Sequence, residues 1–348
     1  MTHPSPAPPG LYLLDPEPAP AWTPFAGARP LSELRAGAHL IRERWEAFVG
    51  AATTEIMALP HLAGFVEPGV PPVTARHPIA GAAIIGSSTF APRGIAPAFP
   101  DGPFRLSCKG VTVGWGVGPG ATWDGPQPHA AAVEVSGVVF DTTAGPVVLE
   151  SGVDVRAGTR LDGPLWAGAN TQLLGGPIKA SAIGPHCKIR GELASCAFLG
   201  YANKAHDGFV GSSVIGRWAN LGAGTITSNL KNTYGAVRLD VAATSIETGL
   251  QFLGSLIGDH AKTAIGTLLA TGTVIGVGAN VFDAVRPPKY VPPFAWGAAE
   301  GARPRAGAAR VTREGFLTIA ERVLRRRDVP MDDATRALFG RIYDWATR

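Results

Sequence analysis

The chain has 348 residues, which is enough for one large domain or two of medium size. Only 17% of the residues are charged, and the net charge is +4 with scattered basic residues, so we expect no nucleic-acid partner. No apolar stretch approaches the ~20 residues of a membrane span, and the first ten residues do not form a signal peptide, so we expect no membrane partner. The cysteines, Cys108, Cys187 and Cys196, lack metal-ligand spacing, which favours a reducing, cytoplasmic setting.

Residues 1–130 predict a small α/β region. Its first ten residues are rich in proline, and LYLL at residues 11–14 predicts a short buried strand. Apolar residues then recur every three or four positions, which predicts an amphipathic helix through residues 31–48. They are Leu31, Leu34, Ala38, Ile41, Trp45 and Phe48. Residues 50–130 are rich in Ala, Pro and Gly, and we place only short strands and loops there.

From residue 131 to about residue 285 the sequence repeats every six residues. The clearest series is Ile257, Thr263, Leu269, Ile275 and Val281. A fixed period of this kind predicts a solenoid, in which six residues supply one flat strand and one corner of a triangular prism. The aliphatic residue points into the interior, and glycine follows where the corner needs an unusual backbone. A β-sandwich with many turns is the alternative, but a sustained register favours the solenoid.

Three segments follow or interrupt this series. Residues 229–250 break the period and predict a protruding loop. Residues 286–311, rich in proline and glycine, predict an extended linker. Two helices are predicted at 312–327, with Thr312 as N-cap, and at 331–346, starting at Asp332 or Asp333. Repeat stacks need capped ends, so we expect a structural role for these helices.

The stretch 203–229 carries the most specific motifs of the chain. NKAHDGF, NLGAGTITSNLKN, the later GDHAKTAIGTLLATGTVIGVGAN and PPFAWG resemble a bacterial group of sugar-nucleotidyltransferase-like proteins. These are related to the bifunctional N-acetylglucosamine-1-phosphate uridyltransferase/glucosamine-1-phosphate acetyltransferase, in the hexapeptide-repeat acyltransferase superfamily. The resemblance implies a left-handed parallel β-helix for residues 131–285. It also implies a homotrimer, because these prisms build their sites between subunits.

The resemblance further implies N-acetylation of an amino-sugar phosphate or amino-sugar nucleotide for the cell envelope, with acetyl-CoA as co-substrate. Such a reaction needs a base that accepts the amine proton, and histidine suits it because its pKa lies near neutrality. The matching histidine is His206, which we predict to be the general base. A structural histidine at a prism corner is the alternative.

The same resemblance suggests binding residues. Candidates for the acceptor are Arg190, Lys204, Phe209, Asn220, Asn229, Lys231 and Arg238. Candidates for coenzyme A are Ala223, Gly224 and Ser255, because a glycine-rich turn lets backbone amides approach a ligand. Phe209 stands where the family has tyrosine, which removes a substrate hydroxyl contact. His260, in GDHAKT, is expected at the solenoid surface without a chemical role.

The N-terminal region lacks the glycine-rich phosphate loop of sugar nucleotidyltransferases, and Arg29-Pro30 is all that resembles its later basic step. We therefore expect a shortened, degenerate nucleotidyltransferase-like region. Mg²⁺ is expected only if that activity exists, and no other metal site is predicted. Two further hypotheses stay open. One is a sugar-1-phosphate nucleotidyltransferase, and the other is a non-catalytic sugar-nucleotide-binding scaffold.

Overall fold

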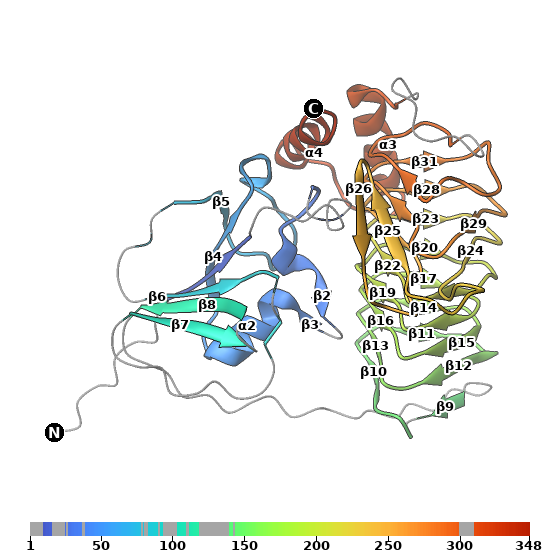
Figure 1. Ribbon diagram of the computed structural model, residues 1–348, viewed down its shortest axis with the longest axis horizontal. Coiled ribbons are helices and arrows are strands. Elements are labelled where there is room, and N and C mark those ends of the chain that lie inside the picture. Colours follow the sequence, from blue (N-terminus) through green and yellow to red (C-terminus); the bar gives the residue numbers. More distant parts are fainter. Residues whose placement is uncertain are drawn as a thin grey trace. The chain divides into compact units, whose positions relative to one another are not determined.

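The computed structural model describes residues 10–15, 25, 27–36, 39–77, 79, 83–89, 91–92, 143–298 and 310–348, and the backbone alone of 103–108, 111–117 and 139–141. The chain divides into two compact units (Figure 1). Unit 1 comprises residues 1–18 and 29–128, and unit 2 comprises residues 19–28 and 129–348.

Unit 1 is a mixed sheet with the strand order β5-β4-β1-β6-β8-β7. The strands are β1 (Gly10–Leu14), β4 (Thr53–Ala58), β5 (Val73–Ala75), β6 (Ala83–Ser87), β7 (Pro103–Cys108) and β8 (Val111–Val117). The strands β5, β4, β1 and β6 run parallel to one another. β8 runs antiparallel to β6, and β7 runs antiparallel to β8. Trp45 of the helix α2 (Ile41–Val49) is fully buried, and its indole packs so closely on Gly86 that a Cβ there would lie 2.7 Å from the ring. The strand β1 confirms the prediction of a short buried strand at residues 11–14.

The helix predicted over residues 31–48 is wrong in its first half. That half contains a 3-10 turn, η2 (Leu31–Glu33), and two short antiparallel strands, β2 (Arg35–Ala36) and β3 (His39–Leu40). A further 3-10 turn, η3 (Pro60–Leu62), follows β4. The helical spacing is overridden by tertiary hydrogen bonds, since the Leu31 N–H donates to Asp15. The helix starts only where the Glu43 carboxylate accepts from the Leu40 N–H.

Unit 2 is a left-handed parallel β-helix, as predicted, with three faces that stack strand on strand (Figure 1). The first face contains β10 (Val147–Leu149), β13 (Leu165–Ala167), β16 (Ala182–Ile183), β19 (Ala197–Phe198), β22 (Val214–Ile215), β27 (Leu256–Ile257), β30 (Val274–Ile275) and β32 (Tyr290–Val291). The second contains β11 (Asp154–Val155), β14 (Gln172–Leu173), β17 (Lys188–Ile189), β20 (Asn203–Lys204), β23 (Asn220–Leu221), β28 (Lys262–Thr263) and β31 (Asn280–Val281). The third contains β9 (Val139–Asp141), β12 (Thr159–Asp162), β15 (Gly176–Lys179), β18 (Leu193–Ala194) and β21 (Val210–Gly211), and the pair β24 (Ile226–Thr227) and β29 (Leu268–Leu269).

The interior of the prism is filled by the periodic aliphatic residues. Ile183, Phe198, Ile215, Ile257 and Ile275 lie in register on the first face, and none of them is exposed. Each aliphatic side chain therefore stacks on its equivalents one coil above and below, which buries apolar area continuously along the axis.

At the corner between the first and second faces, here called the first corner, four successive coils turn on residues with side chains rather than on glycine. His186, Tyr201, Trp218 and His260 follow one another there with φ between 50° and 63°. Their rings form a column, with centroids 4.5, 4.1 and 6.2 Å apart in that order. His260 is only 3% exposed, so its predicted surface position is wrong. It is covered by Phe316 and Phe339, whose rings meet it edge-on at 5.7 and 5.0 Å.

Those two phenylalanines belong to the C-terminal helices α3 (Arg313–Arg325) and α4 (Asp333–Ala346). Both predicted helices are confirmed. The Thr312 hydroxyl caps α3 by accepting from the Gly315 N–H, and the Asp332 carboxylate caps α4 by accepting from the Thr335 N–H. The helices cover the His260 end of the aromatic column and so complete the repeat stack.

The solenoid continues beyond its predicted end at Val285. Tyr290–Val291 adds a further rung beside β30, because prolines on either side hold the segment extended. The insertion at 229–250 carries a hairpin of β25 (Arg238–Val241) and β26 (Thr244–Glu247). This hairpin lies along the side of the chain's own prism, against β30, with Leu239 buried (Figure 1).

We predict that Phe316→Ala destabilises unit 2 by about 3–5 kcal/mol, the usual cost of emptying an aromatic core site. Phe316 is 3% exposed and lies 4.8 Å from the Phe294 ring. Urea unfolding followed by circular dichroism measures the loss. Thr318→Ala, on the exposed side of the same helix, should change stability by less than about 0.5 kcal/mol. An equal effect of both changes would contradict the packing role of Phe316.

Candidate functional site

His206 lies at the corner between the second and third faces, here called the second corner. This corner connects β20 to β21, and the imidazole is exposed there. The corner of the preceding coil carries Arg190, and that of the following coil carries Ala223 and Gly224. The side chain therefore projects from a prism edge that is open to solvent in the single chain.

The turn at His206 belongs to three successive second corners, at residues 174–176, 190–192 and 205–208, that depart from the Gly-Thr pattern of the others. Regular second corners end in Gly-Thr, as at residues 156–159, 222–225 and 264–267, and their glycines have φ of 83°, 69° and 69°. At residues 205–208 the sequence is Ala-His-Asp-Gly, so the glycine stands one position later, with φ of 134°. A Cβ on Gly208 would lie 2.4 Å from the Thr225 carbonyl oxygen, so only glycine fits. The residue predicted to be the base therefore lies on an irregular turn that requires glycine at position 208.

Arg190 and Asp207 form an ion pair across two coils beside His206. The Arg190 Nε donates to the Asp207 carboxylate at 3.1 Å, and its Nη1 donates to the Leu174 carbonyl at 3.2 Å. Both side chains are substantially exposed, so the pair contributes little stability but places one cation next to His206. Arg190, which the sequence predicts to contact an acceptor phosphate, is therefore already paired with the Asp207 carboxylate.

Phe209 and Asn229 meet on the third face beside this corner. Gly211 makes room for both, because a Cβ there would lie 2.4 Å from Phe209 Cζ and 2.7 Å from Asn229 Nδ2. The Asn229 amide also donates to the Ser212 hydroxyl at 3.2 Å. The structure thus brings together His206, Phe209 and Asn229 on adjoining parts of the prism.

Asn220 lies on the other side of the second corner. It points outward from the second face, where its Oδ1 accepts from the Asn203 amide at 3.0 Å. The two predicted acceptor asparagines, Asn220 and Asn229, therefore occupy different faces of the same prism.

Three predicted binding residues have positions that argue against direct ligand contact. Lys204 is 1% exposed and points into the prism, and Ser255 is fully buried. Arg238 is exposed on β25 and paired there with Glu247, on the hairpin that lies against β30. These positions were not evident because the six-residue motif does not mark which polar residues face inward or where an insertion folds back.

Ala223 and Gly224 lie at the second corner as predicted, but part of their turn is occupied. The Gly224 N–H donates to the Asp207 carbonyl, and the Gly222 N–H donates to the Thr263 carbonyl. Those two amides hold the coils together and are not directed at a ligand.

A cavity of about 620 Å³ opens on the third face above Phe209. It is lined by Ile226, Ser228, Leu268, Lys231 and Arg286, among others. Ile226 and Leu268 are paired on successive coils, and the Thr227 N–H donates to the Phe209 carbonyl on the coil below. An apolar strip therefore leads from the His206 corner to a cavity with two cationic side chains. Of the predicted residues it contains only Lys231, because Arg286 belongs to the segment predicted as a linker.

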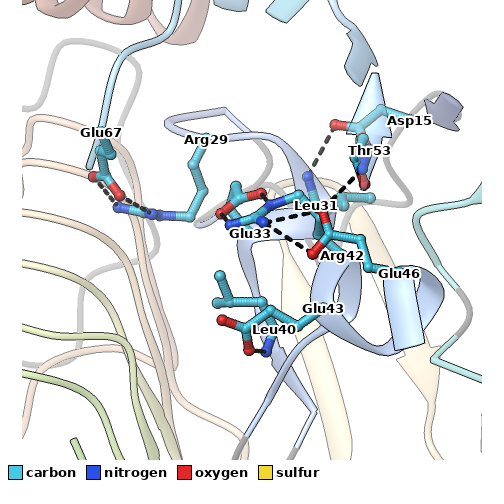
Figure 2. Close-up of polar contacts among 10 residues, drawn as sticks. All are labelled: Asp15, Arg29, Leu31, Glu33, Leu40, Arg42, Glu43, Glu46, Thr53 and Glu67. Atoms are coloured by element: carbon cyan, nitrogen blue, oxygen red, sulfur yellow. Dashed lines mark hydrogen bonds and ion pairs between the residues drawn. The ribbon is translucent and has the colours of Figure 1, made fainter. Parts of the chain in front are cut away.

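Unit 1 contains the other candidate region, around Arg29 (Figure 2). Arg29 is 3% exposed and donates from both terminal nitrogens to the Glu67 carboxylate at 3.1 Å. Arg42 is likewise buried and bonds Glu33 at 2.7 Å and Glu46 at 3.3 Å. Both guanidinium groups are neutralised inside the unit, so neither is open to a nucleotide phosphate.

Asp15 lies at the carboxyl end of β1, close to this network (Figure 2). Its carboxylate accepts from the Leu31 N–H at 2.9 Å, and burial raises its pKa to about 6. Among the residues that the structure describes, no group of three or more His, Cys, Asp or Glu side chains could hold a metal ion. The helices of these same segments include none with the length and apolarity needed to cross a membrane.

Comparison with known proteins finds similarities over parts of the chain. Residues 11–91 match the family described as sugar nucleotidyl transferase. Over 77 residues the chain is 36% identical to a bifunctional sugar-1-phosphate nucleotidylyltransferase/acetyltransferase of Sulfurisphaera tokodaii, which covers 22% of this chain and 19% of that protein. Over 79 residues it is 38% identical to "Bifunctional protein GlmU" of Methanococcus vannielii, with coverage of 22% and 19%. The matched segments thus span about a fifth of the length of these relatives.

Solved structures give a looser match. A hexapeptide transferase family protein from Anaplasma phagocytophilum aligns at 15% identity with 60% of this chain and 99% of its own, with a TM-score of 0.25. Residues 11–91 are thus similar to sugar nucleotidyl transferases, and a segment of about 80 residues is similar to bifunctional nucleotidylyltransferase/acetyltransferases.

We predict that Asp15→Asn removes a pH-dependent part of the stability of unit 1. Because the folded pKa of Asp15 is raised from 3.8 to about 6, its stabilising contribution is complete below pH 3.8 and is lost as the pH rises through 6. A shift of about two units corresponds to roughly 3 kcal/mol between pH 4 and pH 7.

The measurement is hydrogen exchange of β1 and β4 peptides at each pH, taken as the difference between wild type and variant. Asp154→Asn, at a partly exposed carboxylate of unit 2, is the control and should leave these peptides unchanged. A difference that does not vary with pH would count against the buried, titrating Asp15.

Proposed function

We propose that the β-helix is an acyltransferase that uses acetyl-CoA to N-acetylate an amino-sugar phosphate or amino-sugar nucleotide, with His206 as general base. The observation that carries the proposal is the corner at residues 205–208. An exposed imidazole is presented there on a turn that only glycine permits, beside Phe209 and Asn229.

The chemistry follows from this position. The acceptor amine attacks the thioester carbonyl, the new C–N bond forms, and the C–S bond breaks. His206 takes the amine proton, and that proton can pass to the departing thiolate of coenzyme A. Asn229 offers an amide for sugar hydroxyl groups, and Arg190 offers a guanidinium for an acceptor phosphate if it leaves Asp207.

The third face supplies a path for acetyl-CoA. The outward side chains of Ile226 and Leu268 form an apolar strip suited to the pantetheine arm, which has few charges. Lys231 and Arg286 line the cavity beyond it, where they would meet the phosphates of the nucleotide end. The thioester end would then lie near Phe209 and the His206 corner.

The separation of Asn220 from Asn229 supports a homotrimer. Two faces of one prism can meet two different neighbours, so a site between subunits could take Asn229 from one chain and Asn220 from the next. We propose that the complete acceptor site forms in this way.

A second function is favoured by the family match of residues 11–91, namely transfer of a nucleotide to a sugar 1-phosphate. Mg²⁺ would serve that reaction. Against it stands the burial of Arg29 and Arg42 in ion pairs, which leaves neither guanidinium for phosphates. Binding of a sugar nucleotide without turnover is the remaining alternative.

We predict that His206→Ala lowers acetyl transfer by about 10²- to 10⁴-fold, the usual contribution of a general base. Release of free thiol from acetyl-CoA measures it, with glucosamine-1-phosphate and amino-sugar nucleotides as acceptors. His39→Ala, at an exposed histidine of unit 1, is the matched control and should keep full activity.

Full activity in the His206 variant would exclude this residue as base. If the folded wild-type protein releases no thiol with any acceptor, acetyl transfer is wrong, and pyrophosphate release from nucleoside triphosphates then tests the second function.

We predict that Arg286→Ala raises the KM for acetyl-CoA by about tenfold, or 1.4 kcal/mol, through loss of one charge-assisted contact. S-acetylpantetheine has no nucleotide end, so its KM should not change. Steady-state kinetics with both donors distinguishes the two cases. Arg238→Ala, on the hairpin outside the cavity, is the control. Equal changes with both donors would place the phosphates elsewhere.

A further inference from the structure

Lys204 is a charged residue inside a column of apolar side chains. On the second face it is paired with Ile189 on the coil below. Because Asn203 is paired with Asn220, Lys204 and Leu221 occupy the same position on neighbouring coils. It is 1% exposed. An ammonium group in such surroundings is costly unless hydrogen bonds replace its water, so its partners indicate why it is there.

The partners are two corner carbonyl groups. The Lys204 Nζ donates to the Arg190 carbonyl at 2.9 Å and, in a shorter contact, to the His206 carbonyl. These carbonyls belong to two successive second corners, the second of which carries the imidazole. Lys204 therefore ties the backbone of His206 to the coil beneath it, from the inside of the prism.

The regular corners show which group Lys204 replaces. There, a buried threonine at the fourth position satisfies a corner carbonyl. The Thr159 hydroxyl donates to the Arg156 carbonyl at 2.7 Å, and the Thr267 hydroxyl donates to the Ala264 carbonyl at 2.8 Å. At the His206 corner the fourth position is Gly208, and at the preceding corner Glu192 follows Gly191, so neither corner has this hydroxyl. Lys204 donates instead to the first carbonyl of the preceding corner, that of Arg190, and to the second carbonyl of its own corner, that of His206.

We propose that Lys204 is a positioning residue for His206, which holds the altered corner so that the imidazole stays at its place on the prism edge. This inference rests on the proposed acetyl transfer, but it concerns a residue that does not touch the substrate. The exposed Arg190–Asp207 pair braces the same corner from outside, so the imidazole lies between an internal and an external tie.

The ammonium is also poised to titrate. Burial lowers the pKa of Lys204 to about 8, and the nearby Asp207 carboxylate partly opposes this shift. That carboxylate is itself paired with the Arg190 guanidinium, and the apolar Ile189 is paired with Lys204 on the coil below. Because the folded pKa is depressed from 10.5, the charged form weakens folding below pH 8, and this cost disappears as the pH rises towards 10.5. The hydrogen bonds to the two carbonyls weaken over the same interval.

The test compares Lys204→Met, which keeps length without a donor, with Lys204→Gln, which keeps a neutral donor. We expect Lys204→Met to lower kcat about 10- to 100-fold, as misplacement of a catalytic group does, with little change in KM. Its melting temperature should match or exceed that of wild type, because a buried charge is removed. Lys204→Gln should retain intermediate activity. In the wild-type protein kcat should fall above pH 8, where Lys204 loses its proton, and this fall should be smaller in both variants.

Lys262→Met is the matched control. Lys262 is also held away from water, its pKa is also lowered to about 8 by burial, and it donates to the carbonyl of a histidine two residues earlier, His260 at 2.9 Å. That corner is the aromatic first corner, so this variant should not change kcat. A second readout is nuclear magnetic resonance of ¹⁵N-labelled histidine, with the His206 signal assigned from His206→Ala. It should move in Lys204→Met and stay in place in Lys262→Met.

The outcomes separate the two proposals. Unchanged kcat and an unchanged His206 signal in folded Lys204→Met overturn the positioning role and leave acetyl transfer standing. A wild-type protein without acetyl transfer, whose His206 signal still moves selectively in Lys204→Met, overturns the function and retains the positioning. If Lys204→Met does not fold, Lys204→Gln decides by the same two readouts.

Discussion

The register of parallel coils is the constraint on which the β-helix depends. Every coil must place its backbone donors opposite the acceptors of the next coil. After three faces, the chain must return to the face on which it began, one coil further along the axis. The interior then admits only side chains that stack on their equivalents, such as Ile215 on Phe198 and Ile257 on Ile215. Corners must turn sharply with left-handed backbone, by glycine at residues 158, 224 and 266 or by the rings of the first corner. Chemistry can therefore be added only at corners and outward positions, without disturbing this register.

The first and second corners use this freedom differently. At the first corner the outward groups are rings that stack from His186 to His260, and α3 and α4 cover them, so this edge serves stability. At the second corner no such covering is present in the described segments, and His206 stays exposed. The irregular turn at His206 needs Gly208 and is held by an internal donor, Lys204. A repeat protein keeps such an irregularity where a local rule yields to a function.

Much of this could be predicted from the sequence, because the repeat rules are local. The period of six identified the prism, and side-chain capping rules identified the starts of α3 and α4 at Thr312 and Asp332. The predictions failed where distant segments decide the outcome. The helix expected at 31–48 lost its first half to the hydrogen bond between Leu31 and Asp15, two residues far apart in the sequence. The motifs predict Lys204 and Ser255 as contact residues, but both are buried, and polarity alone does not show that a position faces inward. The cavity joins the 229–250 insertion to Arg286, and no periodicity connects those segments.

Phe209 bears on which acceptor the corner would accept. Its ring and the Asn229 amide share the space above Gly211, and the family tyrosine would place a hydroxyl at the same point. Without that hydroxyl, a polar atom of the acceptor placed against the ring would lose its water and gain no hydrogen bond, which is unfavourable by about 1–3 kcal/mol. The same ring favours an apolar or flat acceptor surface, such as the hydrogen-bearing face of a pyranose. The polar contacts of such an acceptor would then have to come from Asn229 on this face and from Asn220 of a neighbouring chain. In the proposed site, phenylalanine in place of tyrosine would therefore shift recognition from one hydroxyl to residues of two subunits, which would make the proposed trimer a condition for specificity.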